Sequence, residues 1–169
     1  AGITRRPGTR YSALVPNLKG LERAIAVGVT DVAVFTAASE TFSRRNINQS
    51  IEESLVTLAT VCERAIREGI RIRAYLSTCF GCPYEGDVPT TRVGELAKRL
   101  VDLGVFEVVI SDSIGVAHPA QVWQVLDAVT SYASLSQIAL HLHDTRGTAL
   151  ANVLAGLQAG VTTYYASCG

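Results

Sequence analysis

The chain has 169 residues, of which 48% are hydrophobic and 18% are charged, and its formal net charge is zero. This composition predicts a single globular domain over residues 1–169, with enough apolar material for a core. The balanced charge argues against nucleic-acid binding, and no run approaches the roughly 18 apolar residues of a membrane span. We therefore expect neither nucleic acid nor a membrane as a partner. Methionine is absent even at position 1, which suggests a processed product, a fragment or an incomplete record of a longer protein.

Four cysteines raise the question of a disulfide or a zinc site. Only Cys79 and Cys82 are close together, and no second pair of ligands stands at the spacing that a structural zinc site needs. No helix is expected to start at Cys79, so the pair lacks the setting that lowers a thiol pKa in redox motifs. We expect reduced thiols that pack in the core, as for Cys62, or in a loop. Cys168 receives no interpretation.

Short apolar runs and amphipathic segments alternate along the chain. Six strands are expected at residues 11–16, 31–37, 70–77, 106–111, 138–143 and 161–166. Five helices are expected between them, at residues 18–27, from Ser50 to Gly69, and at residues 93–103, 119–132 and 148–159. Ser50 and Glu53 form a capping box at the start of the second helix. The segments 38–49 and 78–89 are expected to be loops.

This alternation predicts an α/β fold with a parallel sheet, because a helix separates each strand from the next. A doubly wound sheet and a closed barrel both satisfy the pattern. The first strand is not followed by the Gly-rich turn of a dinucleotide-binding sheet, which favours the barrel. A (β/α)₈ TIM barrel of about 250 residues uses about 31 residues per unit, so 169 residues hold between five and six units. We therefore expect an incomplete TIM barrel.

The segment His141-Leu142-His143 closes the fifth expected strand. Residues two apart in a strand point to the same side, so both imidazoles face one way. At the carboxyl end of a barrel strand, two such histidines are well placed to bind one metal ion. The alternative is that the two side chains hydrogen-bond to neighbouring loops.

Other polar residues near strand ends leave more than one interpretation open. Asp112 ends the fourth strand, where its carboxylate is a candidate base, a partner of a metal ligand or a cap of the following turn. Without further context, the cap is the leading interpretation. Asn46 follows the second strand and has no sufficient local explanation. Arg73, inside a strand, predicts either a buried ion pair or a side chain in a polar mouth. His118 has no evident partner.

Seven segments together resemble the 3-hydroxy-3-methylglutaryl-CoA (HMG-CoA) lyases, which belong to the metal-dependent barrel lyases and Claisen-condensing enzymes. The segments are 16–20 (PNLKG), 37–42 (AASETF), 46–54 (NINQSIEES), 81–86 (GCPYEG), 112–116 (DSIGV), 141–144 (HLHD) and 149–152 (ALAN). The resemblance runs from about residue 5 to residue 167 in one register. The segments 46–54 and 81–86 are the most specific to the lyase branch.

The resemblance implies a (β/α)₈ barrel, represented by its strands 3–8, that uses Mg²⁺ or Mn²⁺ to cleave HMG-CoA into acetyl-CoA and acetoacetate. It implies His141 and His143 as metal ligands, His141 and Asp112 as catalytic residues, and Asn46 and Ser113 as substrate contacts. The first two strands, the other metal ligands and a catalytic cysteine are then expected outside this chain. An acyl-CoA substrate, a homo-oligomer and a location in the bacterial cytoplasm or the mitochondrial matrix are also implied.

Some residues depart from the family pattern. Ser111 and Ser113 stand where the family usually has Gly and Thr, and Tyr165 replaces an Asp; Arg146 and Thr148 replace Tyr and Gln. Two alternatives therefore stay open beside HMG-CoA cleavage. One is a related lyase or condensing enzyme that acts on another acyl-CoA or a 2-oxo acid. The other is a truncated, inactive domain with a structural role and exposed sheet edges.

Overall fold

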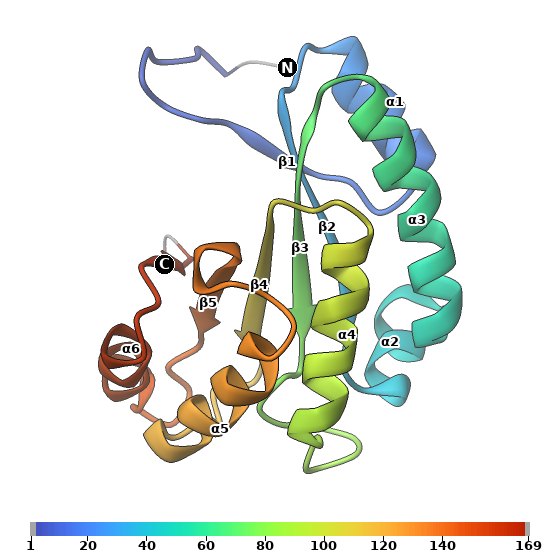
Figure 1. Cartoon of the computed structure of the whole chain (residues 1–169). Helices are drawn as coiled ribbons and strands as arrows, with labels where there is room; N and C mark the ends of the chain where they lie inside the picture. Colours follow the sequence, from blue (N-terminus) through green and yellow to red (C-terminus); the bar gives the residue numbers. More distant parts are fainter. Residues whose placement is uncertain (1–2, 168–169) are drawn as a thin grey trace.

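A computed structural model describes residues 3–167 of the chain, and within that range strands and helices alternate (Figure 1). The strands are β1 (Ser12–Leu14), β2 (Asp31–Ala37), β3 (Arg71–Ser77), β4 (Glu107–Asp112), β5 (Ile138–Leu142) and β6 (Thr163–Tyr165). The helices are α1 (Leu18–Ala26), α2 (Glu40–Ile47), α3 (Ile51–Arg67), α4 (Thr90–Asp102), α5 (Pro119–Thr130), the 3₁₀ helix η1 (Leu135–Gln137) and α6 (Ala149–Gln158). All six expected strands are present, with ends that differ by a few residues.

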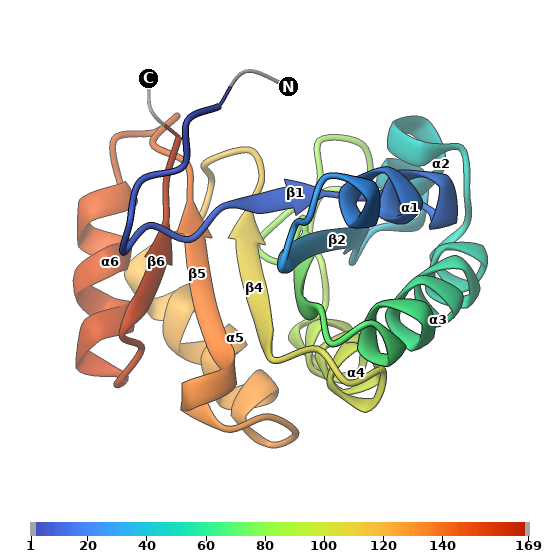
Figure 2. The same ribbon diagram turned by 90° about the horizontal axis from the view of Figure 1, so that it is seen from above.

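The six strands form one parallel sheet whose spatial order is the chain order, β1 to β6. Seen from above, the sheet is curved, and α3, α4, α5 and α6 follow one another around its outer side (Figure 2). Among residues 3–167, β1 and β6 each pair with one neighbour only. The sheet is therefore a partial TIM barrel, which confirms the predicted fold class. No helix in the described part of the chain has the length and apolar character needed to cross a membrane.

The two faces of the sheet differ in burial, and this difference positions the candidate site. On β3, Ile72 and Leu76 are almost completely buried in the core between the sheet and the helices. The alternate residues Arg73, Tyr75 and Ser77 are only partly buried and lie on the concave face. Because strand side chains alternate between faces, one apolar row fastens the helices while a polar row lines the inside of the half-barrel.

The predicted capping box at the start of α3 is confirmed. The Ser50 hydroxyl accepts a hydrogen bond from the Glu53 amide at 3.0 Å, and the Glu53 carboxylate accepts one from the Ser50 amide at 2.7 Å. Gly69, with φ of 68°, follows the helix in the left-handed conformation that favours glycine. These contacts are local in sequence, which is why the residue pattern alone identifies them.

The expected loop over residues 38–49 is wrong, because α2 occupies most of it. The Ser39 hydroxyl accepts from the Phe42 amide at 3.2 Å, Arg44 pairs with Glu40 at 2.9 Å, and Asn48 ends the helix with φ of 55°. The segment is short and polar and has a single buried residue, Ser43, so it carries no apolar stripe from which a helix could be predicted.

Three of the four cysteines lie in the described residues, and all three are free and buried. Burial raises the pKa of Cys62 to about 11 and that of Cys79 to about 12, so both stay protonated at neutral pH. The Cys82 thiol lies 2.9 Å from the Ser39 hydroxyl. These contacts confirm the prediction of packed, unpaired thiols for this part of the chain. Cys168 lies outside the described residues.

Candidate metal and substrate site

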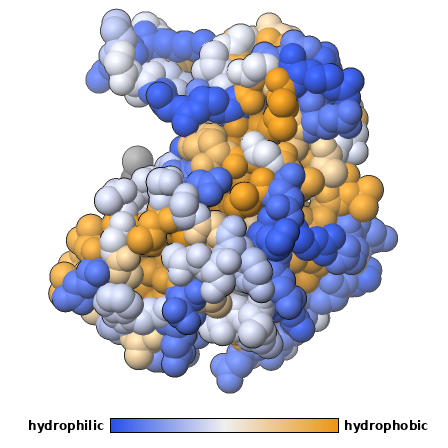
Figure 3. All heavy atoms as spheres, in the orientation of Figure 1, coloured by the Kyte–Doolittle hydropathy of each residue, from blue (hydrophilic) through white to orange (hydrophobic). Residues whose placement is uncertain are grey.

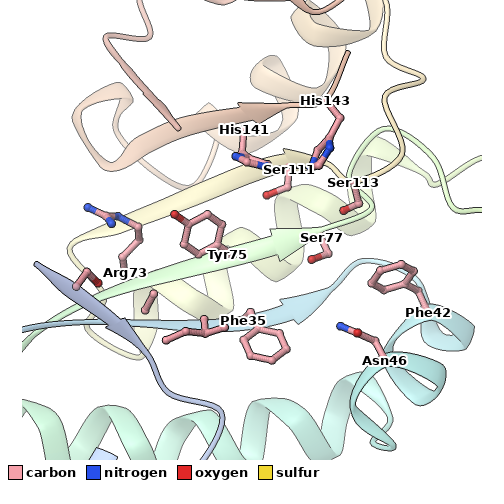
Figure 4. Close-up of a pocket in the computed structure, with 13 residues that line it drawn as sticks. Phe35, Phe42, Asn46, Arg73, Tyr75, Ser77, Ser111, Ser113, His141 and His143 are labelled. Atoms are coloured by element: carbon pink, nitrogen blue, oxygen red, sulfur yellow. Dashed lines mark hydrogen bonds between the residues drawn. The ribbon is translucent and has the colours of Figure 1, made fainter. Parts of the chain in front are cut away.

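A cavity of about 510 Å³ lies on the concave face of the sheet, towards the carboxyl ends of the strands (Figure 4). In the space-filling view, the molecule is hollowed on one side, between the N-terminal segment above and the C-terminal elements below (Figure 3). The cavity is lined from five strands, α2 and the strand ends, by Ser12, Leu14, Ala33, Phe35, Phe42, Asn46, Arg73, Tyr75, Ser77, Ser111, Ser113, His141 and His143. Four of the five predicted site residues are therefore brought together here: Asn46, Ser113, His141 and His143.

His141 and His143 approach each other at the end of β5. Their Nε2 atoms are 3.0 Å apart. This agrees with the expectation that residues two apart in a strand point to the same side. The Nδ1–H of His141 donates to the Tyr165 carbonyl oxygen at 3.0 Å, so the proton of the neutral ring sits on Nδ1. Burial lowers the pKa of His141, and the neighbouring His143 lowers it further. His141 is therefore neutral at pH 7, with its Nε2 lone pair directed at His143.

This donor set fits a divalent cation. Two imidazole nitrogens converge on one point, and one ring is held by a backbone carbonyl through its other nitrogen, as is usual for metal-ligating histidines. Within residues 3–167, no third His, Cys, Asp or Glu joins the pair to complete a cluster of three. A cation bound between the two histidines would therefore need further ligands from outside the described residues.

Ser111, Ser113 and Asn46 present polar groups to the same cavity (Figure 4). Ser111 is directly opposite His141 in the pairing of β4 with β5. The Ser113 hydroxyl oxygen accepts from the Thr78 amide at 2.9 Å, which leaves its proton free to donate to a ligand. Asn46 points into the cavity from α2, across from the two histidines. The helix that the sequence did not reveal is therefore the element that positions this predicted substrate contact.

Asp112 is the predicted site residue that does not reach the cavity. Its neighbours Ser111 and Ser113 face inward, so Asp112 faces the helices and is fully buried. Its two carboxylate oxygens accept from the Val116 amide at 3.1 Å and the Ala117 amide at 3.0 Å. This geometry supports the capping alternative, in which Asp112 holds the loop that leads into α5.

Replacing Asp112 by alanine is expected to lower the free energy of unfolding by about 2–3 kcal/mol, because one buried and one partly buried amide lose their acceptor. Asp112→Asn keeps one acceptor oxygen and should lose about half as much. Urea unfolding measures both values. An Asp112→Asn variant as stable as the original protein but unable to turn over its substrate would contradict the structural role and favour a catalytic one.

Arg73 satisfies both interpretations of its sequence position, since it lines the cavity and is also paired. Its Nε–H donates to Glu107 at 2.6 Å, and the Tyr165 hydroxyl donates to the same carboxylate oxygen at 2.7 Å. The guanidinium lies 4.2 Å from the centre of the Tyr165 ring. Burial and the bond to Glu107 raise the pKa of Tyr165, so its hydroxyl keeps the proton that it donates.

The sequence reasoning missed several residues that line the cavity, among them Phe35, Tyr75 and Ser77. A usable signal was present in β3, because Tyr75 and Ser77 stand two and four residues after Arg73 and therefore share its face. His118, which had no evident partner, caps α5, since its Nδ1 accepts from the Gln121 amide at 3.3 Å. Arg146 and Thr148 do not line the cavity.

Comparison with known proteins identifies the family. The model of the HMGL-like family matches residues 3–167. The chain belongs to this family. It is 50% identical over 168 residues to a hydroxymethylglutaryl-CoA lyase of Bacillus subtilis, a match that covers 99% of this chain and 56% of the relative. The chain thus spans about half the length of the curated relatives it matches.

Solved structures agree with this assignment. The HMG-CoA lyase of Brucella melitensis superposes with a TM-score of 0.96 at 44% identity, over 98% of this chain and 59% of that one. An HMG-CoA lyase from Acinetobacter baumannii, solved with coenzyme A and 3-methylmalate, superposes with a TM-score of 0.90 at 32% identity, over 96% and 53%. The resemblance seen in the sequence motifs is confirmed.

Proposed function

We propose that the HMGL-like chain is part of a divalent-metal-dependent carbon–carbon lyase that cleaves HMG-CoA into acetyl-CoA and acetoacetate. The observation that carries this proposal is the convergence of the His141 and His143 Nε2 atoms, 3.0 Å apart, inside a cavity of about 510 Å³. The 50% identity to a hydroxymethylglutaryl-CoA lyase supports the reaction class, and the coenzyme A complex of a structural relative supports an acyl-CoA substrate.

The proposed reaction breaks the bond between C2 and C3 of the hydroxymethylglutaryl group. The C3 hydroxyl loses its proton and becomes the ketone of acetoacetate, while the bond's electron pair passes to C2 and the thioester as an enolate. Protonation at C2 then gives acetyl-CoA. A Mg²⁺ or Mn²⁺ ion held at this site would supply Lewis acidity, which lowers a hydroxyl pKa and stabilises negative charge.

Different residues of this chain bind the cation and the substrate in this proposal. His141 and His143 would hold the cation through Nε2, and the Tyr165 carbonyl keeps the His141 proton on Nδ1. The free Ser113 hydroxyl proton and the Asn46 amide face the cavity as donors to substrate oxygens. Phe35 and Phe42 add apolar surface to the lining of the cavity.

The test is to incubate the purified protein with HMG-CoA and to quantify acetyl-CoA and acetoacetate. Equal amounts of the two products are expected in the presence of Mn²⁺ or Mg²⁺. Chelation with EDTA should abolish both, and added metal should restore them. Products from a different acyl-CoA or 2-oxo acid, without HMG-CoA cleavage, would replace this proposal by the related-lyase alternative. A protein without any lyase activity would support the structural one.

A further inference from the structure

Tyr165 reaches from the edge strand β6 across the inner face of the half-barrel to β3 and β4. Its hydroxyl donates to the Glu107 carboxylate at 2.7 Å, and the Arg73 Nε–H donates to the same oxygen at 2.6 Å. The Arg73 guanidinium also lies 4.2 Å from the centre of the Tyr165 ring. Glu107 is only 6% exposed. The side chain of Tyr165 is therefore anchored to β3 and β4, whereas the backbone of β6 pairs with β5.

The backbone and ring of the same residue contact the candidate site. The Tyr165 carbonyl oxygen accepts the Nδ1–H of His141 at 3.0 Å. The Tyr165 ring meets the Tyr75 ring edge-on with centroids 5.9 Å apart, and Tyr75 in turn meets His141 edge-on at 6.3 Å. Tyr75 and His141 both line the cavity (Figure 4). One residue thus connects the partly buried Arg73–Glu107 pair to the imidazole that points at His143.

Within residues 3–167, the Tyr165 side chain supplies contacts of β6 with β3 and β4. β6 has three residues, all only partly buried, and it pairs with β5 alone among the described strands. A short edge strand is held weakly by backbone hydrogen bonds on one side. The position of the Tyr165 carbonyl consequently depends on the bonds of the Tyr165 side chain as well as on the backbone hydrogen bonds between β5 and β6.

We infer that Tyr165 is a positioning residue: its hydroxyl bond to Glu107 holds the carbonyl that orients His141, with Nδ1 protonated and Nε2 aimed at the metal position. The role of the metal position rests on the proposed function. The orientation of His141 by Tyr165 rests on the hydrogen bonds of Tyr165 alone. Partners that orient metal-ligating histidines typically change metal affinity by about 10- to 100-fold when they are removed. The Tyr165 hydroxyl does not contact His141 itself and acts through the Tyr165 carbonyl. We therefore expect a change in metal affinity near the lower limit of this range, about 10-fold.

The chain offers a matched control in the adjacent residue. The Tyr164 hydroxyl donates to the carbonyl oxygens of Val153 and Val161, at 3.3 Å and 3.2 Å, and so contacts α6 and the chain before β6. Tyr164→Phe removes the same atom as Tyr165→Phe from the same strand. A loss of stability of β6 alone should therefore appear in both variants, whereas a loss of His141 orientation should appear only in Tyr165→Phe.

Mn²⁺ binding followed by electron paramagnetic resonance, together with ¹⁵N NMR of the histidine rings in metal-free protein, tests the inference. Tyr165→Phe is expected to weaken Mn²⁺ binding about 10-fold and to mix the two tautomers of His141. Tyr164→Phe should match the original protein in both measurements. Equal Mn²⁺ affinity and an unchanged tautomer in Tyr165→Phe would overturn the inference. Both readouts are independent of turnover, so a protein that does not cleave HMG-CoA would end the proposed function while leaving this result intact.

Discussion

Replacing either His141 or His143 by alanine is expected to abolish metal-dependent HMG-CoA cleavage, with a fall in rate of at least about 10³-fold. The Nε2 atoms of the pair are 3.0 Å apart, so each variant removes one of two donors aimed at the same point. Lewis-acid catalysis is worth several kcal/mol, and each 1.36 kcal/mol corresponds to a factor of about ten in rate. Mn²⁺ affinity and the rate of acetyl-CoA release should fall together in both variants.

The third histidine supplies the control for this experiment. His118 is exposed and caps α5 through its Nδ1, outside the cavity lining. His118→Ala should cost about 1 kcal/mol of stability through the lost cap and leave Mn²⁺ affinity and turnover unchanged. If His141→Ala or His143→Ala retains the metal dependence and rate of the original protein, the assignment of the metal position is wrong.

Replacing Glu107 by alanine is expected to lower the free energy of unfolding by about 3 kcal/mol, because it leaves the partly buried Arg73 guanidinium charged and without its partner. The side chains of Arg73 and Glu107 are 19% and 8% exposed, so solvent screens the pair only weakly. The Tyr165 hydroxyl loses its acceptor in the same variant. Thermal unfolding should show a drop in Tm of roughly 10 °C for a chain of this size.

Two further variants test whether the loss of stability in Glu107→Ala comes from the unpaired charge of Arg73 or from the shortened side chain. The double variant Arg73→Met with Glu107→Leu removes both charges while filling the space, and it should recover most of the lost stability. Glu63→Ala breaks the pair of Glu63 with Arg67, whose side chains are 68% and 64% exposed, and no measurable change is expected. A Glu107→Ala variant as stable as Glu63→Ala would show that the Arg73–Glu107 pair is not a buried-charge interaction.

The candidate site combines residues that sequence spacing could place with residues that it could not. His141 and His143 share one side of β5 because strand side chains alternate, and this holds in any sheet. The same alternation turns Asp112 away from the cavity, since Ser111 and Ser113 take the inward positions on β4. Predicting this outcome requires knowing which face of β4 is the concave one, and that depends on how the sheet curves.

The number of predicted strands and the chain length indicated an incomplete barrel. The residue pattern by itself determined the alternation of strands and helices, the capping box at Ser50 and the shared direction of the two histidines. Each of these follows from interactions within a few residues, where hydrophobic period and cap chemistry decide the structure. The helix α2 escaped prediction because its eight residues are polar and are held mainly by caps and one ion pair.

Only the tertiary structure decided which side chains of distant strands meet on the inner face of the half-barrel. Tyr165 and Glu107 are separated by 58 positions in the sequence, and Arg73 and Glu107 by 34. Their bonds exist because the register of neighbouring strands and the curvature of the sheet bring these positions together. A hydrogen bond between remote residues leaves no periodic trace in the sequence, so the support of His141 by Tyr165 appears only once the half-barrel is formed.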